Sequence, residues 1–136
     1  MGGNTYSNIY NVPIKQAYQN EIVSPAESTT YSAKIGLLYV SDYGYAASPE
    51  GWNTVLNDID YTSNDINWMY MGGFDWTISR YSEYADGAFF VDDSGYVSHG
   101  SVRNYRGVGV RPSFYLESSV ELSGGSGTSA DPYRLS

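Results

Sequence analysis

The amino-acid sequence predicts an α+β domain in which one or two helices pack on an antiparallel sheet. One segment, Pro49 to Ile59, combines the start signals of a helix with the apolar spacing of a helical face. Much of the remaining chain consists of short apolar runs of strand length, separated by glycine, aspartate and serine. The chain has 136 residues, which is the length of one domain, so we assign residues 1–136 to a single unit.

The helix prediction for Pro49 to Ile59 rests on the start of the segment and on its apolar face. Ser48 is a favoured N-cap residue, and Pro49 suits the first helical position because its missing N–H leaves no hydrogen bond unmade. Apolar residues then follow at i, i+3, i+4 and i+7, which lie on one face of a helix: Trp52, Val55, Leu56 and Ile59.

The N-terminal segment, residues 1–32, carries weaker signals. Pro13 can open a short helix that runs through Tyr18 to Ile22, and Pro25 would end it. The same residues also fit a loop packed on the core, so both interpretations stay open.

Three strands are predicted before residue 80. The apolar run from Lys34 to Val40 is typical of a strand buried on both faces, and Ser41 to Tyr45 predicts a turn. Two further strands, Asn67 to Met71 and Phe74 to Ile78, flank a Gly-Gly pair. Tryptophan occurs in the helix and in both of these strands, so we expect one core cluster of Trp52, Trp68 and Trp76.

The clearest local signal is a hairpin made by Gly87–Val91 and Tyr96–Val97. The turn between them, Asp92 to Gly95, ends in a glycine that can take a positive φ. A strand from Val108 to Leu116 follows, with Pro112 limiting its hydrogen bonding.

Arg111 lies in that last strand and is predicted to be structural, because a guanidinium there can satisfy several loop carbonyls. Ser119 to Leu122 predicts a short strand. Residues 124–136 predict a glycine-serine turn and a closing strand.

Charge and composition argue against several classes of partner. The formal net charge is −8 with seven Lys and Arg, and no basic stripe occurs, so we expect no nucleic-acid partner and no attraction to an anionic membrane. No run approaches the roughly 18 apolar residues of a membrane span, so we expect no membrane insertion of this segment. The start at Met1 lacks the features of a signal peptide, so an exported form would be a piece of a longer protein.

The sequence offers little catalytic chemistry. Cysteine is absent, which removes disulfides, thiolate metal sites and cysteine nucleophiles. The single histidine, His99, is expected to be a solvent or loop residue, and a Gly-x-Ser-x-Gly elbow fails because Thr128 stands at its last position. A pair of glycosidase carboxylates cannot be read from strand spacing. We therefore expect a protein that is not an enzyme and has no cofactor.

Carboxylates near Asp58 and Asp60 raise the question of calcium. An EF-hand loop opening at Asp58 needs glycine at its sixth position, and that position is Ser63. An EF-hand loop is therefore excluded. A structural calcium held in another way is weighed against plain solvated loops, and we favour the loops and predict no metal site.

Tyrosine makes up 15 of the aromatic residues, against three Trp and four Phe. Tyrosine suits half-buried strands, because its ring packs and its hydroxyl bonds. Tyrosine with serine, glycine and asparagine is also typical of adaptable binding loops. Composition alone favours the core interpretation over the binding surface.

An ordered set of motifs resembles a family of modular surface proteins of gut Firmicutes, often with a type IV prepilin start. The set covers about Ala33 to the end, and its order is more specific than any one motif. It comprises Ala33–Ala46, Asn67-Trp-Met69, Asp75-Trp-Thr-Ile-Ser79, Phe89-Phe-Val-x-x-Ser-Gly95, Gly109-Val-Arg-Pro-Ser-Phe-Tyr-Leu116 and Gly124-Gly-Ser-Gly-Thr-x-x-Asp-Pro-Tyr-Arg-Leu135.

That family is similar to the C-type-lectin-like fold in its formylglycine-generating-enzyme branch. It is also similar to variable proteins diversified by retroelements and to pilin-tip and phage-tail binding domains. The resemblance implies a bacterial extracellular or cell-surface domain that recognises a protein or surface glycan. The enzyme branch needs cysteines, and animal lectins bind sugar through calcium motifs such as Glu-Pro-Asn. This chain has neither, so neither activity is carried over.

In the variable proteins, exposed positions between the tryptophan strand and the Gly-x-Arg strand form the binding face. Carried over, the resemblance implies these ligand-binding residues: Arg80, Tyr81, Glu83, Tyr84, Asp86, His99, Arg103, Asn104, Tyr105 and Arg106. Their two segments are polar and aromatic without a core period, which agrees independently. Two alternatives stay open: the segments are variable loops without a ligand, or the chain is a structural pilus or cell-surface subunit.

Overall fold

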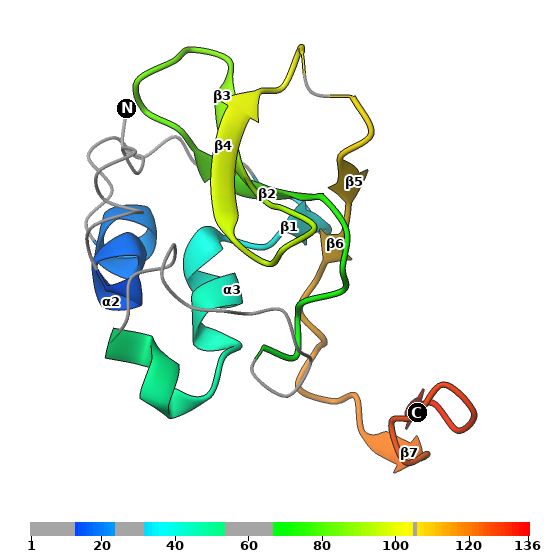
Figure 1. The fold of residues 1–136 in the computed structure, drawn as a ribbon. Coiled ribbons are helices and arrows are strands. Elements are labelled where there is room, and N and C mark those ends of the chain that lie inside the picture. The colour runs from blue at the N-terminus through cyan, green and yellow to red at the C-terminus, as the bar shows by residue number, and fades with distance from the viewer. Residues whose placement is uncertain (1–12, 24–31, 54–66, 105) are drawn as a thin grey trace.

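The computed structural model describes residues 13–23, 32–53, 67–104 and 106–136 of the chain. Within these ranges the chain forms short helices and short strands in mixed order, which confirms the α+β prediction. Figure 1 shows the helices gathered on one side of the central strands, and the C-terminal strands extending beyond the opposite side.

Four strands form the central sheet in the order β4–β3–β2–β5. Strand β2, Asp75–Arg80, pairs antiparallel with β3, Gly87–Val91, which pairs antiparallel with β4, Val97–Ser101. Strand β5, Gly109–Val110, joins β2 in parallel, so the sheet is mixed and not purely antiparallel as predicted. The reason is that the chain crosses from β4 to the opposite edge and enters β5 in the direction of β2.

The hairpin predicted after Gly87 is confirmed. Val91 is the Cα partner of Val97, and β4 continues to Ser101, beyond its predicted end. Gly95 takes a φ of 83°, which explains why the turn uses glycine there. The strand predicted over Phe74 to Ile78 is β2.

Helices cover the inner face of the sheet. Helix α2, Ile14–Tyr18, continues into a π-helical turn, η1, Gln19–Val23, so the helical interpretation of Pro13 to Ile22 is confirmed. Helix α3, Val40–Tyr45, lies between α2 and β2. The core beneath them combines residues of both helices with the inner residues of the strands: Ile14, Ala17, Val40, Tyr43, Ala46, Ala47, Met69, Tyr81, Phe89, Val91 and Val97.

The segment that begins at Lys34 departs from its prediction. Only Gly36–Leu37 forms a strand, β1, which is half-buried and pairs with β6, Pro112–Ser113. The turn predicted at Ser41 to Tyr45 is instead most of helix α3.

A local capping contact and two side chains distant in sequence stabilise the start of α3. The Asp42 carboxylate accepts a hydrogen bond from the backbone N–H of Tyr39 at 2.9 Å, and the Ser79 hydroxyl accepts one from Val40 at 2.9 Å. Glu21 accepts the backbone N–H of Ser41 at 3.1 Å and the Ser79 hydroxyl at 2.5 Å. Because the first N–H groups of a helix need such partners, Ser79 and Glu21 add tertiary support to the local cap made by Asp42.

The strand predicted over Val108 to Leu116 is interrupted at Arg111. Its two parts, β5 and β6, belong to different sheets. Arg111 donates to the backbone carbonyl of Met69 at 2.5 Å and forms an ion pair with the Asp75 carboxylate. The structural role predicted for Arg111 is confirmed.

The strand predicted over Asn67 to Met71 is wrong. Asn67 forms an isolated bridge with Ala47, and a turn follows it. The buried Asn67 amide donates to the Tyr43 carbonyl at 2.8 Å, and its oxygen accepts the backbone N–H of Met69 at 3.0 Å. This local bond offers the backbone an alternative to a strand ladder.

The prediction of a single tryptophan cluster is also wrong. Trp68 is 73% exposed. Trp52 packs edge-on against Tyr45 at 5.4 Å between ring centroids, whereas Trp76 packs edge-on against Phe90 at 5.3 Å. Of the helix predicted from Pro49 to Ile59, a 3-10 turn, η2, Pro49–Asn53, is present, and the remainder lies outside the described residues, as do Asp58 and Asp60.

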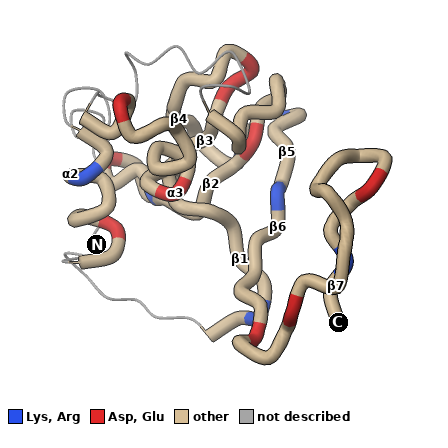
Figure 2. Tube along the Cα trace, turned by 90° about the horizontal axis from the view of Figure 1, so that it is seen from below, with Lys and Arg blue, Asp and Glu red and all other residues tan. Residues whose placement is uncertain are grey.

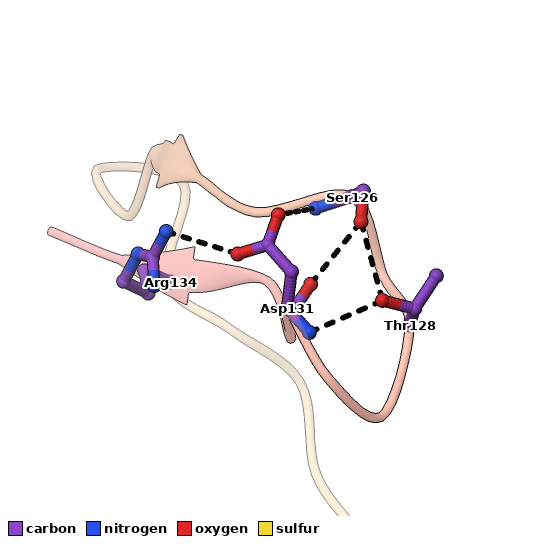
Figure 3. A network of polar contacts seen from close by, with 4 residues as sticks. All are labelled: Ser126, Thr128, Asp131 and Arg134. Atoms are coloured by element: carbon purple, nitrogen blue, oxygen red, sulfur yellow. Dashed lines mark hydrogen bonds and ion pairs between the residues drawn. The ribbon is translucent and has the colours of Figure 1, made fainter.

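The chain closes in a small hairpin of β7, Leu122–Gly124, and β8, Arg134–Leu135, which confirms the closing strand. Figure 3 shows how Asp131 holds the loop: its carboxylate accepts the Ser126 N–H at 3.0 Å and the Arg134 guanidinium at 3.1 Å. Gly125 has a φ of 92°, and a Cβ there would lie 2.1 Å from the Pro132 carbonyl oxygen, so this turn requires glycine.

Candidate binding face

The β3–β4 pairing brings together the two segments that the sequence predicts as a binding face. Gly87, at the start of β3, is the Cα partner of Ser101, at the end of β4. The segments 81–86 and 102–106, of which Tyr105 lies outside the described residues, therefore leave the sheet at the same end, and we call them the loop end. The N–H of Val102 donates to the Asp86 carbonyl at 2.9 Å, which ties the two segments together.

The Asp86 carboxylate adds a side-chain link between the segments. It accepts the Ser101 hydroxyl at 2.8 Å and lies 3.9 Å from the Arg103 guanidinium. The Ser101 hydroxyl also accepts the backbone N–H of Arg103 at 3.2 Å. Asp86 thus positions the loop end, and the sequence reasoning missed Ser101, whose only signal is a polar residue at the end of a strand.

Tyr81 is not on the exposed face, which corrects its expected position. Its side chain is 3% exposed and packs against the rings of Phe89 at 5.5 Å and His99 at 4.2 Å. Its hydroxyl donates to the Glu83 carboxylate. A period-2 signal was present, because Thr77, Ser79 and Tyr81 alternate onto the inner face of β2 and its continuation.

The close packing on Tyr81 depends on Gly87. A Cβ at Gly87 would lie 3.0 Å from the Tyr81 ring and 3.3 Å from the Cβ of Tyr84. Glycine therefore lets the loop fold tightly back onto the first residue of β3.

His99 lies in strand β4 opposite Phe89, not in a loop as expected. Its imidazole is half-buried against Tyr81. Burial lowers the pKa of His99 below its ordinary value, and the Glu83 carboxylate opposes this shift in part. His99 therefore supports the loop end from beneath as a neutral ring at neutral pH.

The exposed residues of the loop end are aromatic, cationic and amide in character. Tyr84 is 62% exposed, and the Arg103 side chain is 82% exposed. Glu83, Asn104 and Arg106 are also exposed, and Arg80 is half-buried at the end of β2. Tyr105 lies outside the described residues. The loop end thus carries the exposed cation Arg103 in a chain of net charge −8.

Other kinds of site find less support within the described ranges. A pocket of about 20 Å³ beside β2, lined by Tyr43, Met69, Trp76 and Arg111 among others, has room for about one water and not for a substrate. No group of three or more His, Asp or Glu side chains that could hold a metal occurs among the described residues. Of the helices described, none is long and apolar enough to cross a membrane.

No family model, curated protein or solved structure matches this chain. Its function is therefore inferred from the residues of the loop end and from the surfaces around it.

Proposed function

We propose that this chain is a non-enzymatic ligand-recognition or adhesion domain, of the C-type-lectin-like kind, and that the loop end is its binding face. The observation that carries the proposal is that segments 81–86 and 102–106, distant in sequence, share one end of a hydrogen-bonded hairpin. Exposed Tyr84, Arg103 and Asn104 stand there on a buried support.

The residue types at the loop end suit recognition. Tyrosine and arginine are among the residues that most often contribute binding energy at interfaces. A rigid support reduces the entropy lost on binding, and here the Asp86 links and the buried Tyr81 ring provide it. The ligand is a protein or a surface glycan, since the face lies on the outside of the molecule and not in a pocket.

The setting of this domain follows from the resemblance alone. We propose that it belongs to a longer exported bacterial protein, extracellular or on the cell surface, and that its face varies as in retroelement-diversified proteins. Variation among strains that is confined to the exposed positions of the loop end would support this setting.

The test is a glycan and surface-protein array probed with the purified chain, with and without calcium. We expect reproducible binding that is indifferent to calcium and is lost in the variant Tyr84→Ala/Arg103→Ala. The matched control is Trp68→Ala, which removes an aromatic ring that is 73% exposed and lies outside the loop end. Binding that survives the loop-end substitutions would contradict the assignment of the face.

The alternative is a structural pilus or cell-surface subunit without a ligand of its own. The observation that favours it is the exposure of large apolar side chains after β6, where Tyr115 is 101% exposed. A correctly folded protein that binds nothing on the arrays would favour this alternative.

A further inference from the structure

The chain beyond β6 exposes several large apolar side chains to solvent. We call residues 114–136 the C-terminal arm. Figure 1 shows it leaving the body of the molecule, with its closing hairpin standing apart from the central sheet, and Figure 2 shows the same separation from below. Six large apolar side chains of the arm are at least half exposed: Phe114, Tyr115, Leu116, Leu122, Tyr133 and Leu135.

A second apolar surface lies on the outer face of the sheet, opposite the helices. Trp76 is the Cα partner of both Phe90 on β3 and Val110 on β5, so these side chains share a face. Ile78 is 48% and Val110 65% exposed, and Trp76 is half-buried. We call this surface the outer face.

The exposed apolar area of the arm is large enough to contribute to a dimer interface. An aromatic side chain buries about 150–250 Å², so the exposed parts of Phe114, Tyr115 and Tyr133 offer roughly half of the ~800 Å² that each partner buries in a standard interface. The three leucines add to this area. In a twofold dimer, each arm docks on the other copy, so the contact between arm and outer face is made twice.

Charges on the two surfaces are complementary. The arm carries Glu117 and Glu121, both exposed, while its other acid, Asp131, is occupied by Arg134. Arg80 follows Trp76 and Ile78 in the outer-face alternation of β2, and no ion pair within the described ranges includes it. Opposite charges at the rim of an apolar contact favour one orientation of the partner.

We propose that two copies of this chain form a dimer in which the C-terminal arm of each docks on the outer face of the other. This inference goes beyond ligand recognition and uses a different surface from Tyr84 and Arg103, with Arg80, at the end of β2, on the boundary between the two. The arm of one copy supplies the apolar residues and carboxylates, and the outer face of the other supplies Trp76, Ile78, Val110 and Arg80.

Sedimentation velocity of the full chain over a range of concentrations tests the proposal. We expect a dimer for the unchanged protein, and at least tenfold weaker association for the arm variant Tyr115→Ser/Leu122→Ser and for the face variant Ile78→Ser/Val110→Ser. Arg80→Glu, which leaves the apolar residues in place, weakens association several-fold. Tyr84→Ser is the control and leaves the dimer intact, and circular dichroism checks that each variant folds.

A mixture of the arm variant and the face variant provides the sharpest result. In a mixed pair, the intact arm of the face variant meets the intact face of the arm variant, so half of the interface remains. We expect a 1:1 heterodimer stronger than either homodimer. A monomer at every concentration, or a dimer that the arm or face variants leave unchanged, overturns the proposal without touching the recognition function.

Discussion

Tyrosine and aspartate occur at both ends of the β3–β4 hairpin, but the tyrosines bond to the backbone at one end and face solvent at the other. At the turn end, residues 92–96, the hydroxyl of Tyr43 donates to the Gly95 carbonyl at 2.8 Å, and the hydroxyl of Tyr70 donates to the Asp93 carbonyl at 2.6 Å. The Asp92 carboxylate accepts the backbone N–H groups of Ser94 and Tyr96 at 2.9 and 3.0 Å. Nearby side chains here bond to the backbone of the turn.

At the loop end, the same kinds of residue keep most of their side-chain surface exposed. Asp86 again organises the backbone, through Ser101 and Val102, but Tyr84 and Arg103 project into solvent. The comparison teaches that a tyrosine-rich composition does not distinguish a core from a binding face. What distinguishes them is whether the topology turns each tyrosine toward a backbone carbonyl or toward solvent.

The largest difference in the free energy of unfolding is expected between substitutions of two tyrosines of the loop end, Tyr81 and Tyr84. Tyr81→Ala removes a buried ring that packs on Phe89 and His99, so we expect the free energy of unfolding to fall by about 3–5 kcal/mol. Tyr84→Ala lowers it by only about 0.5–1.5 kcal/mol, because that ring is mostly exposed and packs on the Tyr81 ring at 5.4 Å between centroids. Urea unfolding of both variants measures this, and equal losses would contradict the division into support and face.

The turn end provides the next largest effect. Tyr43→Phe leaves the buried carbonyl of Gly95 without its donor, which lowers the free energy of unfolding by about 1–3 kcal/mol. Tyr84→Phe is the matched control, since its hydroxyl lies on a mostly exposed side chain. Thermal unfolding compares the two variants. A turn end that tolerates Tyr43→Phe as well as the control would mean that its tyrosine is not structural.

Glu21 tests how the strand leading into the loop end responds to pH. Burial raises the pKa of Glu21 above its ordinary value of 4.5, while hydrogen bonds from Ser41 and Ser79 lower it in part and the Asp42 carboxylate raises it further. The folded state therefore binds more protons than the unfolded state between pH 4.5 and the folded pKa. Stability contributed by this group rises as pH falls through that window. Glu21→Gln is expected to lose this rise, and urea unfolding at several pH values measures it. A variant with the same pH slope as the unchanged protein would show that Glu21 does not titrate in this way.

Titration of His99 is expected to change stability with pH in the opposite direction to Glu21, and by less. Its pKa in the folded state lies below the ordinary value of 6.5, so the folded state binds fewer protons and stability is lost as pH falls from 6.5 through the folded pKa. His99→Gln is expected to remove that loss. Thermal unfolding between pH 7.5 and 5.5 checks it, provided that each melting temperature is compared with the same protein at pH 7.5. A steeper loss in the variant would place the acid sensitivity elsewhere.

Sequence reasoning succeeded where short-range signals decide the structure. The hairpin from Gly87 and the turn at Gly95 follow from local residue chemistry, and each is present. The two segments of the loop end were also predicted to share a face, and the strand register explains why they meet.

The remaining elements depend on contacts that a single sequence does not reveal. Helix α3 is stabilised by Ser79 and Glu21, and the strand expected before it yields to that helix. The strand expected through Arg111 is divided because the guanidinium bonds to Asp75 and Met69. In the site, the burial of Tyr81 and the strand position of His99 follow from pairing in the sheet and not from composition.

A library of single substitutions tests the contrast between the two ends most directly, with resistance to protease as the measure of folding. We predict that variants substituted at Tyr84, Arg103 and Asn104 resist protease as well as variants substituted at exposed positions elsewhere. Variants substituted at Asp92 and Gly95 are expected to be digested and so depleted from the library. Depletion at Tyr84, Arg103 and Asn104 as strong as at Asp92 and Gly95 would contradict it, because the exposed residues of the loop end would then be needed for the fold and not left free for a ligand.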